Sequence, residues 1–353
     1  MSRADLPEVI VIGAGGVGVI AALSLSLAGE SRVSLVVRSD YEQVREHGYE
    51  INSCDYGQLR NWRPHRFFKG VEEASESGKF FEYVVVTTKN IPDGPEGSTV
   101  PDVIRPIVES NRRLCPERQT NILLIQNGID IEKDIYAKFD CANEKIVVLS
   151  GTQLIGSTKI GKGVIRQIGQ DHILVGPFDV QNKAAVDAAQ KFIDLYRCED
   201  RNLVLFDDKV RYTRWRKLIY NSVISTTTAL VGMDVSRCLK FGVAGMGTEE
   251  EIFKPGMREI FAIAASEGIE LDEECISFFC DISRKQEYKP SMCIDCENGQ
   301  LMELEVLLGN PLKIARENGV ETPVLSLLYN MLYMVQNKLK EQKGYIKFEL
   351  DDE

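Results

Sequence analysis

The fold is decided by the stretch EVIVIGAGGVGVIAALSLSLAGESRVSLVVRS, which runs from Glu8 to Ser39. It begins with a β-branched run at 9–12, passes through the glycine pattern G-x-G-x-x-G at 13–18, and continues into a segment rich in alanine and leucine. A second β-branched run follows at 33–37. Strand, glycine turn, helix and strand in this order predict the first βαβ unit of a parallel, dinucleotide-binding sheet.

Each glycine of the pattern has its own predicted task. Gly13 allows the tight turn, Gly15 lets the backbone approach a pyrophosphate, and Gly18 lets the helix pack closely on its strand. The N-terminus of the helix adds N–H groups and a positive dipole for the anion. We therefore expect the whole loop to bind the cofactor, which means Gly13, Ala14, Gly15, Gly16, Val17 and Gly18.

The residue at the end of the second strand selects the cofactor. A protein that binds NAD usually carries Asp or Glu there, about 20 residues after the last glycine, to bind the ribose 2′-hydroxyl. This chain has Arg38, whose guanidinium can pair with a 2′-phosphate. The sequence therefore predicts NADPH/NADP as the cofactor, the alternative being a solvated arginine at a strand end.

The composition is that of a folded, globular protein. Of 353 residues, 44% are hydrophobic and 27% are charged, which is enough for two domains with a core each. The net charge of −11 argues against nucleic acid as a partner. We interpret the nine cysteines as reduced thiols of a cytoplasmic protein, and the three scattered histidines argue against a metal site.

One segment, at 9–28, is apolar enough to be compared with a signal or membrane segment. It lacks a basic region at its start and contains four glycines, so a buried strand and helix explain it better. The prediction is therefore a chain without a targeting sequence and without a membrane partner.

Two further buried strands are predicted from the continuous apolar runs at 83–87 and 121–125. Each run is followed by polar residues, among them Lys89 and Asn127. Because parallel sheets place ligand contacts beyond the carboxyl ends of their strands, both residues are candidates for cofactor contacts.

The connections between these strands are less regular. The segment 91–101 is too rich in proline and glycine for regular structure, and 52–69 is interpreted as irregular or as an edge strand. A hairpin is predicted between 160–168 and 172–175, so that a sheet that starts parallel ends with antiparallel strands.

From residue 207 onward the apolar residues recur with helical spacing, and five helices are predicted, at 211–231, 249–266, 272–283, 302–318 and 324–340. The predicted fold class is α/β, with an N-terminal Rossmann-type dinucleotide-binding domain at 7–203, an all-helical C-terminal domain for substrate binding and dimerisation at 204–342, and a charged tail at 343–353. The apolar surface of 324–335 exceeds one helix face, which favours burial against another domain or a second subunit and hence a homodimer.

Several polar residues of the second half could carry chemistry. Lys217 and Asn221 are four residues apart and share a helix face, and a lysine facing the core can have a lowered pKa that suits a proton donor. Equally, Lys217 can be one cation of a solvated face in RYTRWRK. Glu303 can be a first-turn helix acid and Ser291 a helix cap, so the residues alone leave both readings open.

A set of motifs, spread in order over nearly the whole chain, resembles the ketopantoate reductase (2-dehydropantoate 2-reductase) family. The set comprises GAGGVG, Arg38, TTK at 87–89, QNG at 126–128, WRKLIYN at 215–221, PSMCID at 290–295, MELE at 302–305 followed by Gly309, and ENGVETP at 317–323. Each motif is modest alone, but together they are specific.

The resemblance implies NADPH-dependent reduction of a small 2-keto acid, 2-dehydropantoate, to pantoate, a step of pantothenate biosynthesis. It further implies roles for individual residues. Lys217 and Glu303 match the catalytic pair, Arg38, Lys89 and Asn127 match cofactor contacts, and Asn221, Ser225 and Ser291 match substrate contacts.

The chain also departs from the family pattern. Ser225 and Leu308 stand where the family often has asparagine, and Lys89 leads into a loop rich in proline and glycine. These differences weaken the identity of the substrate more than the reaction type. Two alternatives stay open, namely a related NADPH-dependent oxidoreductase with a different 2-keto or hydroxy acid, and a non-catalytic NADP-binding regulatory protein.

Overall fold

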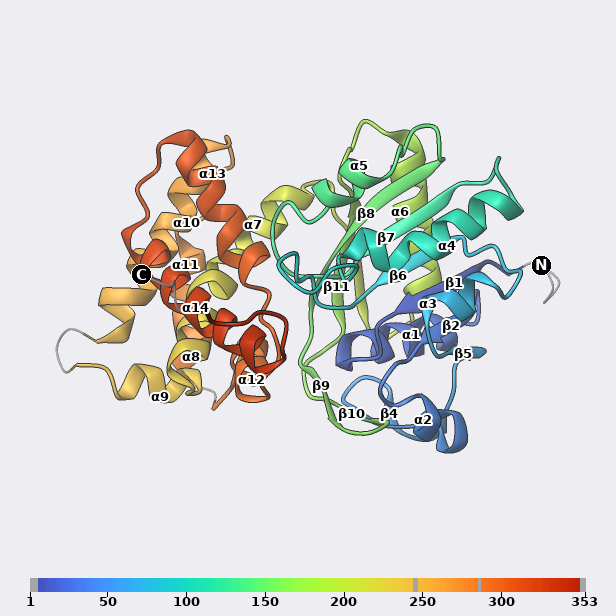
Figure 1. The fold of residues 1–353 in the computed structure, drawn as a ribbon, viewed down its shortest axis with the longest axis horizontal. Helices are drawn as coiled ribbons and strands as arrows, with labels where there is room; N and C mark the ends of the chain where they lie inside the picture. Colours follow the sequence, from blue (N-terminus) through green and yellow to red (C-terminus); the bar gives the residue numbers. More distant parts are fainter. Residues whose placement is uncertain (1–5, 244–246, 285–286, 350–353) are drawn as a thin grey trace. The chain divides into compact units, whose positions relative to one another are not determined.

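The computed structural model describes residues 6–243, 247–284 and 287–349 (Figure 1). The chain forms two compact units. The first consists of Met1–Lys89, Val100–Gln126 and Ile131–Val210, and the second of Asn90–Thr99, Asn127–Asp130 and Arg211–Glu353. The second unit therefore takes two short segments from the first half of the sequence.

The main sheet of the first unit has eight strands in the order β12-β11-β8-β7-β6-β1-β2-β5. These strands are β1 (Glu8–Ile12), β2 (Arg32–Val36), β5 (Arg66–Phe68), β6 (Tyr83–Val86), β7 (Thr120–Leu124), β8 (Ile146–Leu154), β11 (His172–Pro177) and β12 (Leu203–Phe206). All neighbours pair in parallel except β8 and β11. The predicted α/β class is confirmed, as is a sheet that starts parallel and ends with antiparallel strands, since β11 and β12 run opposite to the other six.

Helices cover both faces of this sheet because alternate residues of a buried strand point to opposite sides. Val9 and Val11 belong to a core that also contains residues of α1 (Gly16–Ala28) and α6 (Lys183–Tyr196). Ile10 is equally buried but lies outside that core. Figure 1 shows α6 alongside β8 and β11. The remaining helices of this unit are α2 (Tyr41–His47), α3 (Val71–Ser75), α4 (Val100–Leu114) and α5 (Lys133–Lys138).

A second, smaller sheet has the order β4-β3-β10-β9, from β3 (Tyr49–Ser53), β4 (Gly57–Trp62), β9 (Ser157–Gly161) and β10 (Val164–Gln167). The predicted hairpin between 160–168 and 172–175 is wrong. The turn lies inside the first of these segments, at Gly163, whose φ of +69° glycine tolerates best. The strand that follows, β11, joins the main sheet instead.

A buried polar cluster ties the small sheet to the main one. Asp171 is fully buried and accepts hydrogen bonds from Tyr56 Oη (2.8 Å), Gln153 Nε2 (2.7 Å) and Tyr196 Oη (3.1 Å). Tyr56 follows β3, Gln153 lies in β8 and Tyr196 ends α6. Since a buried carboxylate needs such donors, the three elements are held in one arrangement.

The second unit is helical, as predicted. Its elements are α7 (Val210–Tyr220), η1 (Asn221–Ser225), α8 (Thr226–Val231), α9 (Val235–Lys240), η2 (Glu249–Phe253), α10 (Lys254–Ser266), α11 (Glu274–Arg284), α12 (Ser291–Glu297), η3 (Glu305–Gly309), α13 (Asn310–Asn318) and α14 (Pro323–Gln342), where η marks π-helical turns. The five predicted helices are present, three of them with a π-helical turn. The short helices α9 and α12 were not predicted.

Three predictions concern the surface of α14, the charged tail that follows it and the absence of a membrane-spanning helix. On α14, Leu325, Leu328 and Leu332 are buried, whereas Met331 and Met334 are exposed. The charged tail begins after α14, and its residues 350–353 lie outside the described part of the chain. Within the described ranges, no helix is both long and apolar enough to cross a bilayer.

All nine cysteines are free thiols. Cys293 and Cys296 form a C-x-x-C pair in α12, so an interpretation of the nine cysteines that assumes no such pair is wrong on this point. Burial raises the pKa of Cys293 to about 11 and also raises the pKa of Cys296. Both thiols are therefore protonated near neutral pH, unlike the thiolate of a redox-active pair.

Candidate active site

The glycine loop between β1 and α1 has the geometry of an anion cradle. Gly13 has a φ of +118°, and a Cβ atom added at Gly18 would lie 1.9 Å from Gly13 O, so a side chain is excluded at both positions. A Cβ atom at Gly15 would meet nothing within 4 Å. Gly15 caps α1, and no side chain of the described residues caps that end of the helix. The N–H groups of the first turn are thus available to a phosphate.

The other three residues of the loop are fixed by their neighbours. Ala14 and Val17 pack against the core of the unit. A Cβ atom at Gly16 would lie 2.4 Å from Ser157 O, in strand β9 of the small sheet. The close approach of β9 therefore explains why position 16 is glycine. The G-x-G-x-x-G pattern itself does not require glycine there.

Three more strands, β2, β6 and β7, end at the same edge of the sheet as this loop. Arg38 follows β2 and is exposed. Thr87 follows β6 and donates from Oγ1 to Gly13 O at 3.0 Å. Gln126 follows β7 and donates from Nε2 to Thr88 O at 2.6 Å. Lys89 is exposed and is the last residue of the first segment of this unit. The predicted cofactor residues of the first unit thus gather where open α/β sheets bind ligands.

A second group of predicted residues lies in the helical unit, around Glu303. This carboxylate is buried, with 7% of its surface exposed. Oε2 accepts from Asn127 Nδ2 at 3.0 Å, and Oε1 accepts from Asn90 N at 3.1 Å. Each partner is the residue at which the chain passes from the first unit into the second, after β6 and after β7. Glu303 therefore holds the two segments that continue from those strand ends.

Gly128 fixes the position of Asn127 in this group. Its φ is +98°, and a Cβ atom there would lie 2.5 Å from Val306 Cβ in η3. The next residue, Ile129, donates from its backbone N to Val306 O at 3.2 Å. The glycine of the QNG motif is thus needed for the contact that brings Asn127 to Glu303.

Lys217 lies on α7 and is partly buried. Burial lowers its pKa to about 8, the nearby cation of Arg214 adds to the lowering, and the carboxylate of Glu303 opposes it. Arg214 is itself buried and donates from Nη1 to Gly128 O at 3.0 Å. An ammonium that gives up its proton near neutral pH suits general acid–base catalysis.

The three predicted substrate residues lie on two elements. Asn221 and Ser225 are the first and last residues of η1, directly after α7, and Ser225 is buried. Ser222 Oγ donates to Leu307 O at 2.7 Å, which ties η1 to η3. Ser291 is exposed at the start of α12, a helix that contacts η1.

Sequence reasoning missed two contributors to the site. Asn90 acts through its backbone N–H, which no side-chain pattern reveals. Arg214 was visible only as one cation of RYTRWRK, although its burial could have been suspected from Trp215 and Leu218 beside it. The π-helical turns have no sequence signature of their own, and such turns often occur at functional sites.

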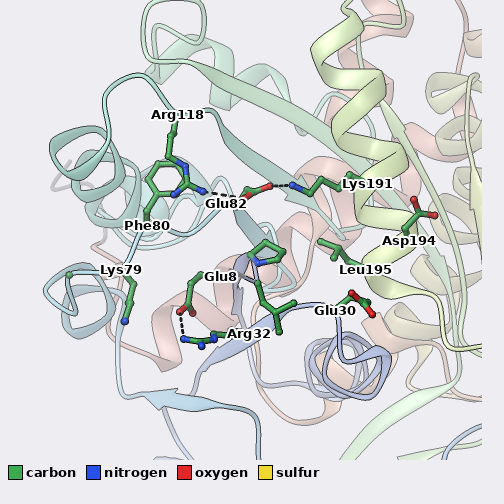
Figure 2. Close-up of a pocket in the computed structure, with 13 residues that line it drawn as sticks. Glu8, Glu30, Arg32, Lys79, Phe80, Glu82, Arg118, Lys191, Asp194 and Leu195 are labelled. Carbon is green, nitrogen blue, oxygen red and sulfur yellow. Dashed lines mark hydrogen bonds and ion pairs between the residues drawn. The ribbon is translucent and has the colours of Figure 1, made fainter. Parts of the chain in front are cut away.

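A pocket of about 770 Å³ lies at the opposite edge of the main sheet (Figure 2). Several of its charged groups pair with one another. Glu82 pairs with Arg118 at 3.2 Å and with Lys191, and Glu8 lies 3.9 Å from Arg32. None of the predicted site residues, all of which lie in the described part of the chain, lines it. These are the amino ends of the strands, where α/β sheets do not bind cofactors.

The glycine cradle and the strand-end residues define a Rossmann-type protein. Residues 9–180 match the family described as "Ketopantoate reductase PanE/ApbA", and residues 209–336 match its C-terminal counterpart. The chain therefore belongs to the ketopantoate reductase family and is an oxidoreductase by class.

The chain is similar to several individual proteins over nearly its full length. The chain is 59% identical to an uncharacterized protein of Saccharomyces cerevisiae, over 98% of both chains. It is 24% identical to a 2-dehydropantoate 2-reductase of Nostoc, over 93% of this chain and 95% of that one. The crystal structure of 2-dehydropantoate 2-reductase from Methylococcus capsulatus covers 94% of this chain and 97% of its own, with 26% identity and a TM-score of 0.72.

Proposed function

We propose that this protein reduces a 2-keto acid to the 2-hydroxy acid with NADPH, and that 2-dehydropantoate, which gives pantoate, is the first candidate substrate. The observation that supports this most is that burial lowers the pKa of Lys217 to about 8, while the buried carboxylate of Glu303 acts on the same lysine in the opposite direction. That carboxylate also holds Asn90 and Asn127. The family membership points to the same reaction and, through it, to pantothenate biosynthesis.

The residues have separate tasks in this proposal. Bound NADPH supplies the hydride. As the carbonyl oxygen of the substrate gains negative charge, the ammonium of Lys217 stabilises it and donates the proton. Glu303 accepts a hydrogen bond from the substrate and keeps Lys217 charged. Asn221, Ser225 and Ser291 contact the substrate, and Lys89 and Asn127 contact the cofactor.

The identity of the acid is the least constrained part of the proposal. Ser225 and Leu308, which replace asparagines often found in the family, are both buried in π-helical turns. A shorter or apolar side chain at these positions offers fewer hydrogen bonds to a polar substrate tail. A related 2-keto acid with another side chain is therefore the second candidate.

Steady-state oxidation of NADPH over a panel of 2-keto acids tests the proposal. The panel includes 2-dehydropantoate, its analogue without the hydroxyl, and acids with longer apolar tails. Highest kcat/KM with 2-dehydropantoate supports the first candidate, and highest kcat/KM with another member supports the second. Binding of NADPH without turnover of any member would instead indicate a regulatory protein.

We expect Arg38→Ala to raise the KM for NADPH about tenfold or more while leaving NADH nearly unaffected, because a charge-assisted pair with the 2′-phosphate is lost. NADH is the cofactor to compare, because a D-mandelate dehydrogenase of this fold was solved with NADH. Steady-state kinetics with both cofactors measure the effect. Equal losses for NADPH and NADH would contradict the role of Arg38.

We also propose a homodimer, in which the exposed side of α14 is covered by a second subunit. Leu327 and Met334 on this helix are 62% and 66% exposed, and the ketopantoate reductase of Staphylococcus aureus is described as dimeric. Sedimentation equilibrium should give twice the chain mass. A mass of one chain at every concentration would reject the dimer.

Two broader expectations remain part of the proposal. We place the boundary near residue 204, between a dinucleotide-binding domain and a helical substrate domain. We also place the protein in the cytoplasm, because its cysteines are free thiols. Limited proteolysis tests the first expectation, and fractionation of cells tests the second.

A further inference from the structure

A second cation, Lys159, lies beside the two residues that follow Arg38 in the sequence. Lys159 comes from β9 of the small sheet, far along the chain from the glycine loop. Its Nζ lies 3.1 Å from both carboxylate oxygens of Asp40 and 3.4 Å from Ser39 Oγ. Ser39 and Asp40 directly follow Arg38. The ammonium is therefore held beside the residue that the sequence assigns to cofactor choice.

Strand β9 spans the site from the glycine loop to the end of β2. Ser157 approaches the loop so closely that only glycine fits at position 16. Side chains two residues apart in a strand lie on the same face, so Ser157 and Lys159 share one. One strand thus contacts both the loop predicted to hold the pyrophosphate and the two residues that follow Arg38, which is predicted to hold the 2′-phosphate.

The carboxylate beside Lys159, that of Asp40, is buried and hydrogen-bonded within the protein. Asp40 is 2% exposed and also accepts from Gly163 N at 3.1 Å and from Ser39 Oγ at 2.8 Å. Burial alone would raise the pKa of Asp40, but these hydrogen bonds and Lys159 hold it below its ordinary value. The carboxylate is therefore charged, and without Lys159 it would repel a phosphate placed beside it.

Lys159 itself keeps access to solvent, with 35% of its side chain exposed. Its contact with Ser39 is the longest of the three, and an ammonium donor can exchange such a contact for a phosphate oxygen.

From these observations we propose that Lys159 is a specificity-determining residue, which binds the 2′-phosphate of NADPH together with Arg38 and neutralises Asp40. The inference rests on the proposed use of NADPH and deepens it. The small sheet then has a function of its own, since it carries one wall of the cofactor site. Lys159 acts on cofactor choice and not on the chemical step.

Binding measurements test this without turnover. Isothermal titration gives Kd for NADPH and NADH, and for the fragments 2′,5′-ADP and 5′-AMP, which differ in the 2′-phosphate alone. We expect Lys159→Met to raise Kd for NADPH and 2′,5′-ADP about tenfold and to change Kd for NADH and 5′-AMP less than about twofold. Lys159→Arg should retain most of the preference because it keeps the charge.

The matched control is Lys162→Met, which removes an exposed lysine from the turn of the same hairpin. Circular dichroism and thermal unfolding establish that each variant is folded. Should Lys159→Met not fold, Lys159→Gln removes the charge and keeps a polar partner for Asp40.

The outcomes separate this inference from the proposed function. If the wild-type protein prefers NADPH and Lys159→Met behaves like Lys162→Met, the role of Lys159 is overturned while NADPH use stands. If the wild-type protein binds NADPH and NADH equally, the predicted cofactor preference fails, and the role of Lys159 fails with it.

Discussion

Replacement of Lys217 by alanine is expected to lower kcat about 100-fold or more, the usual range for a positioned general acid. Without the ammonium, reduction of the carbonyl builds an alkoxide that nothing neutralises. Affinity for NADPH should change little, because the cofactor residues of the first unit are untouched. Stopped-flow and steady-state oxidation of NADPH measure both quantities.

The pH dependence of the wild-type enzyme gives a second view of Lys217. Burial lowers its pKa to about 8, so the protonated form that donates in reduction predominates below this pH and is lost above it. We expect kcat for reduction to fall as the pH rises through about 8 and the reverse reaction to gain. Lys217→Ala should lack this limb, whereas Lys209→Ala, an exposed control just before α7, should keep it. Near-normal kcat in Lys217→Ala would show that the lysine takes no part in the reaction.

Replacement of Glu303 is expected to have the second largest effect. Glu303→Ala should raise KM for the keto acid and also lower kcat, because the carboxylate is assigned to the substrate as well as to the lysine. It also leaves the N–H of Asn90 and the amide of Asn127 without their acceptor. Loss of buried hydrogen bonds to a charged group predicts reduced stability, by about 1.5–3 kcal/mol for each.

The effect of the charge of Glu303 can be measured separately from the effect of its hydrogen bonds, through the pH dependence of kcat. Glu303 raises the pKa of Lys217 against the effect of burial, so Glu303→Gln should move the upper pH limb of kcat to lower pH. Glu305→Gln serves as the control, since Glu305 accepts instead from Tyr329 at 2.8 Å. An unshifted limb in Glu303→Gln, or an equal shift in both variants, would rule out the assigned coupling.

Local signals made the first βαβ unit predictable. The glycine pattern fixes a turn, and the runs around it have the period of their elements, so strands, helix and the position of Arg38 could all be placed from the sequence. The ends of β6 and β7 were predictable for the same reason, because a continuous apolar run followed by polar residues marks the edge of a buried sheet.

Contacts between distant segments could not be predicted in this way. The small sheet depends on the pairing of β3 with β10, which lie more than a hundred residues apart in the sequence. Nothing in the sequence of either strand indicates which strand it pairs with. For this reason the hairpin was predicted between 160–168 and 172–175, whereas its turn lies at Gly163, inside the first of these segments. Lys159 consequently went unnoticed, since nothing near it in sequence belongs to the cofactor site.

The functional residues show the same division. The identity of Glu303 and Lys217 came from their resemblance to a family, whereas the partners of Glu303 depend on backbone geometry at Asn90 and on the close contact of Gly128 with Val306. The cation that helps to lower the pKa of Lys217, Arg214, is specified by packing. The sequence thus pointed to the groups proposed to react, and the structure showed the neighbours that act on them.

The most direct test of the account is to follow the transferred hydrogen. The purified protein is incubated with 2-dehydropantoate and with NADPH deuterated at carbon 4 of the nicotinamide, separately on each face, and the product is analysed by mass spectrometry. We predict pantoate with one deuterium at carbon 2 from one of the two labelled faces and with none from the other. Absence of labelled 2-hydroxy acid with either face, for 2-dehydropantoate and for every other 2-keto acid tried, would contradict the proposed reaction.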